Sequence, residues 1–307
     1  MATTENEGPG PRDPGRILNG VIWAVVSMVL FTITPVLVRQ LGTDMTPVEI
    51  IFHRSVISAV GIGAFFLWRD IGGLRTRVLR IHLARSFINL VAIATWFQAI
   101  LMMPLTEATA LHFTLPLFTV ILAALFLSEQ VGWRRWCATI IGFLGVLIVL
   151  RPGIVEVGLP EFLVLASALF YAGAVIFIKH LTKTDGALAI AFYANVFMAL
   201  IAAIPVIFLW RGPSLDEVPL LFLMAAVGTA APYCLTRALH LLEASLVAPM
   251  DFLRLPFTAV AAWLVFAEIP DNWTWVGAGV IFGATSYIAR REARLARSNG
   301  SAGTGRR

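Results

Sequence analysis

Long apolar runs separated by short polar breaks make up most of the chain. Each run is about 20 residues long, the length that a helix needs to cross the hydrocarbon core of a bilayer. The runs are apolar on all sides, whereas strands of a membrane barrel are about ten residues long and alternate in polarity. The pattern therefore predicts an all-α polytopic membrane protein. We expect ten transmembrane helices, at residues 18–38, 47–68, 81–103, 109–127, 135–150, 159–179, 187–210, 219–241, 244–266 and 273–289.

The two ends of the chain depart from this pattern. Residues 1–15 are polar, rich in Gly and Pro, and lack the basic and then apolar order of a cleavable signal peptide, so we expect a disordered tail. Residues 291–307 combine a short basic stretch with a Gly- and Ser-rich end. They predict a second, basic tail outside the bundle.

Composition supports the membrane interpretation. Of the 307 residues, 59% are apolar and 13% are charged, against about 25% charged in a typical soluble domain. Too few polar side chains remain to cover a water-facing surface, which excludes a soluble globular protein. Cys137 and Cys234 are isolated in separate apolar runs, so the sequence offers neither a disulfide framework nor a thiolate metal cluster.

The basic residues predict the orientation in the membrane. If the N-terminus is cytoplasmic, 17 of the 23 basic residues fall on the cytoplasmic side, and only Arg39, Arg151 and Arg211 fall on the outer side. The cytoplasmic set is Arg12, Arg16, Arg69, Arg75, Arg77, Arg80, Arg85, Arg134, Arg135, Lys179, Lys183 and the six arginines from Arg290 onward. This bias follows the positive-inside rule, so we expect both termini in the cytoplasm and no nucleic-acid partner.

The second half of the chain repeats the first. A shift of 139 residues aligns segment 111–130 with segment 250–269, and a shift of 140 residues aligns Phe52 with Phe192. The identical pairs in the two segments are Phe113 with Phe252, Phe118 with Phe257, Thr119 with Thr258, Ala123 with Ala262, Leu125 with Leu264 and Glu129 with Glu268. Apolar helices resemble one another by composition alone, but the paired Phe and Glu positions favour a duplication over coincidence.

Each predicted copy, residues 16–150 and residues 151–290, contains five helices. Because five is odd, the copies must cross the membrane in opposite directions, which predicts two inverted five-helix repeats. Inverted repeats hold a site near the bilayer midplane and expose it to each side in turn when one repeat moves against the other. The architecture therefore indicates a carrier, and we place it in a cell inner membrane.

The sequence also resembles a known family. The segment PLTEATALHFTLPLFTVILAALFLSEQ, followed by WRRWCATIIGFLGVLIVLRP, looks like the signature half of an EamA-type transporter of the drug/metabolite transporter superfamily. The second copy, EASLVAPMDFLRLPFTAVAAWLVFAE and then WTWVGAGVIFGATSYIARR, is similar to the second half of that family. The resemblance covers about residues 18–290. It implies ten helices, two EamA repeats, a central cavity and transport of small organic metabolites in either direction.

Ionisable residues inside the predicted spans are functional candidates, because a charge at the bilayer centre costs about 2.5–3.5 kcal/mol on insertion scales. Asp251 and Arg254 lie on one face of the ninth span, and they either only neutralise each other or form a substrate or proton site. His112 aligns with Asp251 under the 139-residue shift, so the two are expected to face each other. A lone histidine is either a hydrogen-bonded packing residue or a ligand. Pro249 and Pro256 flank the pair and free backbone carbonyls of the kind that line transporter cavities.

Other polar side chains in the spans are weaker candidates. Arg54 could bind a substrate carboxylate or phosphate, and the alternatives are a pair with Glu49 or a side chain that reaches the membrane interface. The remaining substrate-binding candidates are Trp96, Gln98, Tyr233 and Asn195. An aromatic ring beside an amide suits a planar or amphipathic solute, but such residues also mark interfaces and fill gaps between helices. Gly279 and Gly283 form a GxxxG step that we expect to pack inside the bundle, with a homodimer as the alternative to a monomer.

The sequence lacks the motifs GxxxxGK[ST], HExxH, CxxC and GxSxG. We therefore predict no enzyme, no cofactor and no metal site, and a gradient as the energy source, through either proton coupling or exchange. The leading hypothesis is a secondary transporter that moves a small amphipathic or amino-acid-like metabolite by alternating access. The alternatives are a broad-specificity efflux carrier for drugs or toxic metabolites, an intramembrane enzyme, and a receptor or scaffold.

Overall fold

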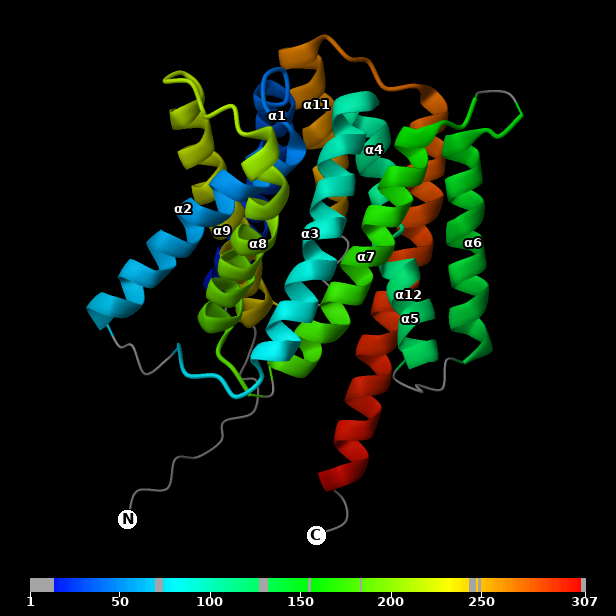
Figure 1. Cartoon of the computed structure of the whole chain (residues 1–307). Coiled ribbons are helices and arrows are strands. Elements are labelled where there is room, and N and C mark those ends of the chain that lie inside the picture. Colours follow the sequence, from blue (N-terminus) through cyan, green and yellow to red (C-terminus); the bar gives the residue numbers. More distant parts are fainter. Residues whose placement is uncertain are drawn as a thin grey trace, which may run out of the picture.

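The computed structural model describes residues 14–69, 74–126, 132–153, 156–182, 184–242, 247 and 250–304. The elements within these ranges are helices, which stand side by side in one bundle (Figure 1). They are α1 (Pro14–Leu41), α2 (Pro47–Arg69), α3 (Leu79–Met102), α4 (Leu105–His112), α5 (Leu115–Phe126), α6 (Trp133–Leu150), α7 (Leu159–Leu181), α8 (Ala187–Leu209), α9 (Glu217–Leu241), the 3₁₀ turn η2 (Asp251–Leu253), α11 (Arg254–Phe266) and α12 (Asn272–Thr304). The expected all-α fold is confirmed.

Seven segments of the described chain are long and apolar enough to cross a membrane, and Trp136–Leu150 is a shorter apolar helix. The seven are Ile17–Leu41, Pro47–Trp68, Leu79–Met102, Leu105–Leu125, Leu159–Leu181, Ala187–Phe208 and Glu217–Leu239. Each lies within a few residues of a span expected from the sequence. The expected spans at 244–266 and 273–289 correspond to η2 with α11 and to α12.

The ends of the bundle differ from the expected tails. α1 begins at Pro14, a residue that suits the first turn of a helix because its missing N–H would have no partner there. Residues 1–13 of the expected N-terminal tail lie outside the described residues. α12 continues to Thr304, past the expected end at residue 289, because Ala, Arg, Glu and Leu dominate this stretch and favour a helix.

Two of the expected spans are interrupted, at matching positions of the two halves. Phe113 and Thr114 separate α4 from α5, and the 3₁₀ turn η2 precedes α11. Each interruption comes just before a proline, Pro116 or Pro256. A proline ring clashes with the carbonyl four residues earlier, so the two prolines divide helices that apolarity alone predicts to be continuous.

The two halves have the same order of helices and run in opposite directions. A shift of 140 residues carries the bounds of α2 onto those of α8, and a shift of 139 carries the start of α6 onto that of α12. In Figure 1, α2 runs from the upper to the lower end of the bundle and α8 runs from the lower to the upper end. The same reversal relates α3 to α9 and α6 to α12. Helix contacts follow this exchange, because α1 packs on α9 as α7 packs on α3, and α1 packs on α11 as α7 packs on α5.

Glycines allow a close approach between α6 and α12. A Cβ atom at Gly277 would lie 2.7 Å from the carbonyl oxygen of Gly145, and one at Gly145 would lie 2.9 Å from the carbonyl oxygen of Gly277. Gly279 and Gly283 have no described atom within 4 Å of their Cβ positions. The expectation that this second pair packs inside the bundle is wrong, because the two residues lie on the opposite face of α12.

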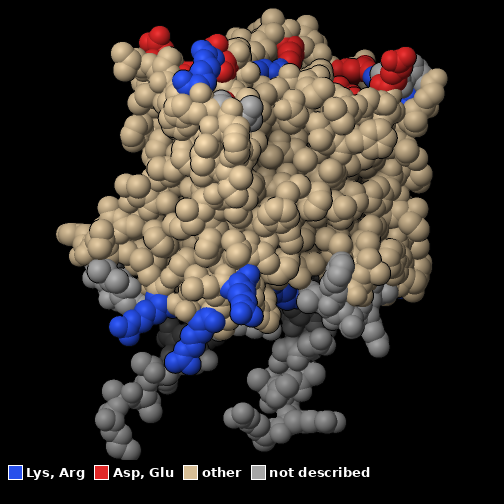
Figure 2. All heavy atoms as spheres, in the orientation of Figure 1, with Lys and Arg blue, Asp and Glu red and all other residues tan. Residues whose placement is uncertain are grey.

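Charged side chains gather at the two ends of the bundle. On the face shown in Figure 2, the middle of the bundle carries no Lys, Arg, Asp or Glu. The exposed basic residues of the lower end include Arg75, Arg77, Arg80, Arg134 and Lys179. Acidic residues of the upper end are Asp44, Glu49, Glu107, Glu156, Glu161, Asp216, Glu217, Glu268 and Asp271. An uncharged belt between two charged ends suits a bilayer environment.

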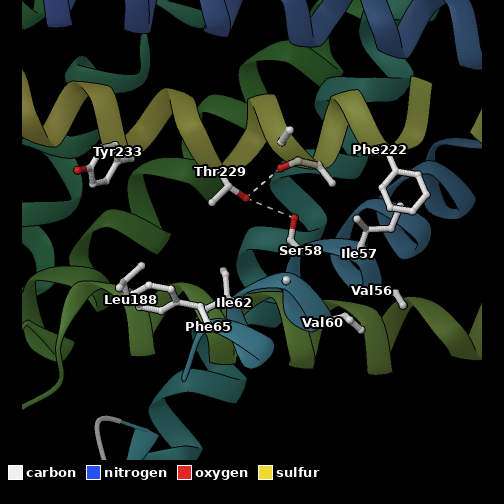
Figure 3. A pocket seen from close by; sticks show the side chains of 13 residues that line it. Val56, Ile57, Ser58, Val60, Ile62, Phe65, Leu188, Phe222, Thr229 and Tyr233 are labelled. Atoms are coloured by element: carbon white, nitrogen blue, oxygen red, sulfur yellow. Dashed lines mark hydrogen bonds between the residues drawn. The ribbon is translucent and has the colours of Figure 1, made fainter. Parts of the chain in front are cut away.

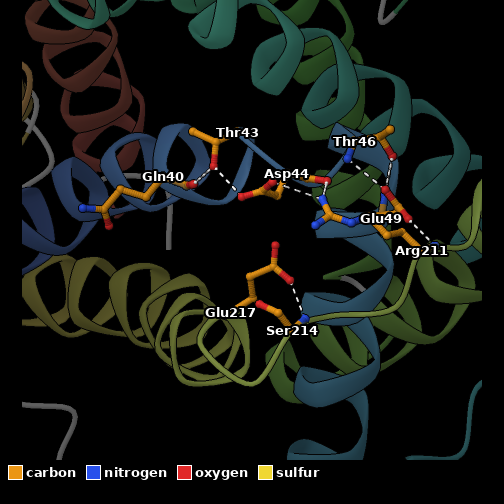
Figure 4. Close-up of polar contacts among 8 residues, drawn as sticks. All are labelled: Gln40, Thr43, Asp44, Thr46, Glu49, Arg211, Ser214 and Glu217. Atoms are coloured by element: carbon orange, nitrogen blue, oxygen red, sulfur yellow. Dashed lines mark hydrogen bonds and ion pairs between the residues drawn. The ribbon is translucent and has the colours of Figure 1, made fainter.

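The arginines at the upper end are neutralised by acidic partners. The pairs are Arg39 with Glu268, Arg151 with Asp271 at 2.5 Å, and Arg211 with Asp44 at 3.2 Å. Figure 4 shows that the backbone N–H of Arg211 also donates to Glu49, whose carboxylate accepts the backbone N–H and the hydroxyl of Thr46. These contacts join the connection between α1 and α2 to the connection between α8 and α9.

A buried polar cluster joins two connections at the lower end. Nε2 of His82 lies 2.9 Å from the carboxylate of Asp185, which also accepts a hydrogen bond of 2.9 Å from the hydroxyl of Thr76. The side chains of His82 and Asp185 are 0% and 3% exposed. The Tyr193 hydroxyl donates to the carbonyl of Leu74 at 2.6 Å. The cluster therefore ties the residues before α3 to the connection between α7 and α8.

Candidate functional site

The two helix interruptions meet at one small cavity inside the bundle. It is lined by Trp96, Thr109, His112, Phe113, Leu115, Pro116, Asp251 and Arg254. Four residues that the sequence singles out therefore come together, from α3, α4, η2 and α11. His112 and Asp251 line the same cavity, as their matching positions in the two halves predict. Phe113 and Phe252 pack the two interruptions against each other, with ring centroids 5.7 Å apart.

His112 is held among side chains of α3 and α7. Its ring lies 4.6 Å from the ring of Trp96 and 5.6 Å from that of Tyr171, between centroids. Its Nε2 atom is 3.5 Å from Oγ of Ser167, which donates to the carbonyl of Ala92 at 2.8 Å. Because the Ser167 proton is used in that bond, its oxygen is free to accept the Nε2–H of His112. The imidazole is thus fixed on one side and faces the cavity on the other.

Asp251 and Arg254 form the predicted pair, but a loose one. Oδ1 of Asp251 lies 3.6 Å from Nη1 of Arg254, which is an ion-pair distance and too long for a good hydrogen bond. The guanidinium carbon of Arg254 lies 4.7 Å from the ring centroid of Phe31 in α1. Both charged groups therefore keep hydrogen-bonding capacity that a solute could use. Among the described residues, no group of three His, Cys, Asp or Glu side chains is placed to hold a metal ion.

The volume of the cavity limits what it can hold as it stands. It measures about 90 Å³, whereas pockets for small organic molecules measure about 300–1,000 Å³. A metabolite can enter only if the helices around the cavity separate. Movement of η2 and α11 against α4 would enlarge it most directly, because these elements meet at the two interruptions.

Arg54 does not line this cavity. Its Nη1 atom lies 3.0 Å from the position that a Cβ atom would take at Gly228, so the glycine in α9 leaves space for the guanidinium. The alternative pair with Glu49 is not formed, because that carboxylate binds Thr46 and Arg211 instead. The Nε atom of Arg54 is buried and has no hydrogen-bond partner in the described chain.

The other three predicted residues also lie apart from the cavity. Asn195 donates its amide to the carbonyl of Ala191 in its own helix, at 2.9 Å. Gln98 is half-buried in α3. Tyr233 is 56% exposed, and its ring packs edge-on against Trp23 with centroids 6.3 Å apart. A sequence pattern finds polar residues within apolar runs, but it does not give the direction in which each side chain points.

Tyr233 lines a larger groove on the outside of the bundle, between α2, α8 and α9 (Figure 3). The groove measures about 820 Å³ and its lining is almost entirely apolar. The hydroxyls of Ser58 and Thr229 lie 3.5 Å apart within it. Val60 and Phe222, at 66% and 59% exposed, form its open sides. This groove offers an apolar surface to the region where we expect lipid.

Two further observations go beyond the sequence predictions. Arg85, which we expected on the cytoplasmic side, is buried in α3 with 9% of its surface exposed, because it points into the bundle rather than toward the helix end. Ser167 and Tyr171 contact His112, although neither was a candidate. Their spacing of four residues on one face of an apolar helix is a signal that could have found them.

The comparisons with known proteins bear on the family. The model of the EamA-like transporter family matches residues 18–151 and, a second time, residues 158–290. The chain belongs to the EamA-like transporter family. The resemblance in the sequence motifs is therefore confirmed, and the chain is a multi-pass membrane protein of a transporter family. The two matches coincide with the two halves that the internal repeat defines.

Curated relatives cover nearly the whole chain. An S-adenosylmethionine uptake transporter of Rickettsia prowazekii is 31% identical over 276 residues, which are 90% of this chain and 94% of the relative. A riboflavin transporter of Vibrio cholerae is 31% identical over 290 residues, 91% of this chain and 96% of the relative. A pseudopaline exporter of Pseudomonas aeruginosa is 28% identical over 278 residues, 89% and 96% of the two chains. All three are named as transporters of small metabolites.

A solved crystal structure supports the fold. It aligns with 90% of this EamA-family chain and 98% of its own, with a TM-score of 0.58 and 15% sequence identity. At this identity the likeness concerns the fold alone. The family and the named relatives indicate membrane transport rather than enzymatic activity.

Proposed function

We propose that the protein is a secondary transporter that moves a small amphipathic or amino-acid-like metabolite across an inner membrane by alternating access. The single observation that carries the proposal is the pair of helix interruptions at matching positions, with four polar or aromatic side chains in one cavity between them. Interrupted helices at the interface of two repeats are where secondary carriers bind their solutes. Either proton coupling or exchange could drive the movement.

The proposed membrane arrangement has ten spans in two inverted repeats, residues 16–150 and 151–290. The opposite directions of matching helices and the symmetric helix contacts support it. The exposed arginines of the lower end support a cytoplasmic location of that end, and hence of both termini. The paired arginines of the upper end fit the outer side, since ion pairing offsets their positive charge.

The substrate class follows from the cavity and from the relatives. Trp96 and His112 offer ring faces for a planar heterocycle, while Arg254 and Asp251 suit a carboxylate and an ammonium group. S-Adenosylmethionine and riboflavin, which appear in the names of the relatives, both carry planar heterocycles with polar substituents. Names of relatives include both uptake and export, so we propose that the solute gradient sets the direction.

A second candidate function is the efflux of amphipathic drugs or toxic metabolites. The apolar groove between α2, α8 and α9 favours it, because a solute dissolved in the bilayer could reach such a groove without crossing water. In that case, vesicles should extrude amphipathic dyes, and widening the groove side chains at Val60 or Phe222 should reduce the rate.

Transport by purified protein in liposomes tests the proposal. Radiolabelled S-adenosylmethionine and riboflavin are the first solutes to supply, followed by amino acids. We expect Asp251→Asn and Arg254→Ala to lower the initial rate about 10- to 100-fold, which corresponds to losing a charged hydrogen bond to the solute of about 1.5–3 kcal/mol. Asp216→Asn, at an exposed site of the upper end, is the matched control and should transport normally. Normal rates in both cavity variants, with folding retained, would remove the site from the proposal.

A further inference from the structure

The charges inside the bundle do not balance. Three arginines, Arg54, Arg85 and Arg254, lie within the spans and away from the bundle ends. In the described part of the chain, the only carboxylate that faces any of them is Asp251, which pairs with Arg254. Two positive charges are therefore left without a counter-charge in the part of the protein where charge is least tolerated.

Arg85 is the more deeply buried of the two. Its residue is 9% exposed, and Nη1 makes a single long contact of 3.4 Å with the carbonyl of Ile190 in α8. Its Nε atom is buried without a hydrogen-bond partner among the described residues. A guanidinium has five N–H donors, so most of the hydrogen-bonding capacity of Arg85 is unused.

Arg54 shows the same pattern from α2. Its Nε atom is also buried and unpartnered, and its Nη1 atom occupies the space that Gly228 leaves in α9. Arg54 is not placed to reach the membrane surface through its charged end, because the guanidinium points toward α9 and into the bundle. The alternative in which the side chain extends to the interface therefore does not hold in the described structure.

Tyr171 connects the two arginines to the cavity. Its hydroxyl lies close enough to Arg54, Arg85 and Arg254 for its charge to interact with all three. Its ring also contacts His112, which lines the cavity. The three arginines thus surround one region of the interior, beside the cavity at the helix interruptions.

The fold itself does not require these two arginines. Under the repeat shifts that match α2 to α8 and α3 to α9, the second half carries Ala194 in place of Arg54 and Met224 in place of Arg85. Both residues are buried, at 4% and 0% exposure. Small or apolar side chains therefore fill the equivalent positions of the same helices, which points to a role for the arginines other than packing.

We propose that Arg54 and Arg85 form an anion-binding subsite, which receives a carboxylate or phosphate group of the transported solute. The inference rests on the proposed transport function and specifies its substrate class. Arginine binds either group through two parallel N–H donors, and the solute would supply the missing counter-charge. The remainder of the solute would lie toward Trp96 and His112, with Tyr171 between the two parts of the site.

Thermal unfolding of the detergent-purified full chain tests the subsite, with sodium phosphate and sodium acetate as probes and sodium chloride at equal ionic strength as reference. We expect at least one of the two anions to raise the melting temperature of the unmodified protein by about 2–4 °C, since it binds only the folded state. Arg54→Met and Arg85→Met should lose most of this rise. In chloride alone they should be at least as stable as the unmodified protein, because an unpaired buried charge has been removed.

Two further variants keep the test decisive. Arg77→Met, at an exposed arginine of the lower end, should respond to the anions like the unmodified protein. Arg54→Lys and Arg85→Lys retain the charge without the two-pronged donor and should keep a reduced rise, which covers the case in which a Met variant does not fold. Equal rises in all variants, no rise with either anion, or a lower stability of folded Met variants in chloride would each overturn the subsite.

Transport measurements separate this proposal from the one on which it rests. If liposomes transport a solute and the Met variants keep both the rate and the anion response, the subsite is wrong and the carrier stands. If no solute is transported but the anion response disappears in the Met variants, the anion site stands and the transport function is wrong.

Discussion

Buried charged side chains in this protein differ in how they are compensated. Asp185 is enclosed by His82 and Thr76, and Asp251 pairs with Arg254, whereas the pair of Arg211 and Asp44 lies at the exposed upper end. The same carboxylate therefore has a different energetic weight in each place. Removing one member of a buried pair leaves its partner uncompensated, while an exposed pair exchanges its contacts with water.

This difference gives a prediction for two matched substitutions. Asp185→Asn should lower the free energy of unfolding by about 3–5 kcal/mol, because His82 and Thr76 lose the carboxylate that they share. Asp44→Asn, in a pair whose side chains are 53% and 57% exposed, should cost about 1 kcal/mol or less. Thermal unfolding in detergent measures both. Equal effects of the two substitutions would contradict the burial of the lower-end cluster.

Residue chemistry could be predicted from the sequence only in part. Asp251, Arg254 and His112 stand out because they are polar groups within apolar runs, and the repeat shift pairs two of them across the halves. Arg85 was placed with the surface arginines, since its position six residues into α3 does not reveal that its side chain turns inward. Tyr233 faces outward for the same reason: apolar positions cover every side of a membrane helix, so no amphipathic stripe reports direction.

At the scale of the element, helices are set by apolar length and are modified by proline and glycine. Apolar runs predict the spans within a few residues, but they do not show that Pro116 and Pro256 divide two of them. Close contacts between helices are equally hidden. Gly145 and Gly277 pack backbone against backbone, while the GxxxG step of Gly279 points away from the bundle.

A pair of substitutions in one helix tests this assignment. Gly277→Ala should destabilise the protein by about 1–3 kcal/mol, because the added methyl group meets the carbonyl oxygen of Gly145. Gly279→Ala, which meets open space in the same helix, should be neutral or stabilise by about 0.5–1 kcal/mol, since alanine favours a helix over glycine. Melting temperatures of the two variants should therefore move in opposite directions or differ clearly. A loss of stability only in the Gly279 variant would mean that this face of α12 is covered, as in a homodimer.

The whole molecule combines these features into a bundle with two different ends. Ion pairs join the helices at the upper end, a buried cluster joins the connections at the lower end, and the small cavity lies between them. Helices related by the repeat shift run in opposite directions and make equivalent contacts. An arrangement that looks alike from either side of the membrane allows the same movement to open the cavity to one side and then to the other.

Cysteine labelling tests the inverted arrangement most directly. In a background without Cys137 and Cys234, single cysteines replace Glu156, in the connection between α6 and α7, and Arg77, in the connection between α2 and α3; both positions are exposed. With intact cells and a membrane-impermeant maleimide, we predict that the Glu156→Cys protein is labelled at once and the Arg77→Cys protein only after permeabilisation. Labelling of both positions from the same side would contradict the two inverted repeats.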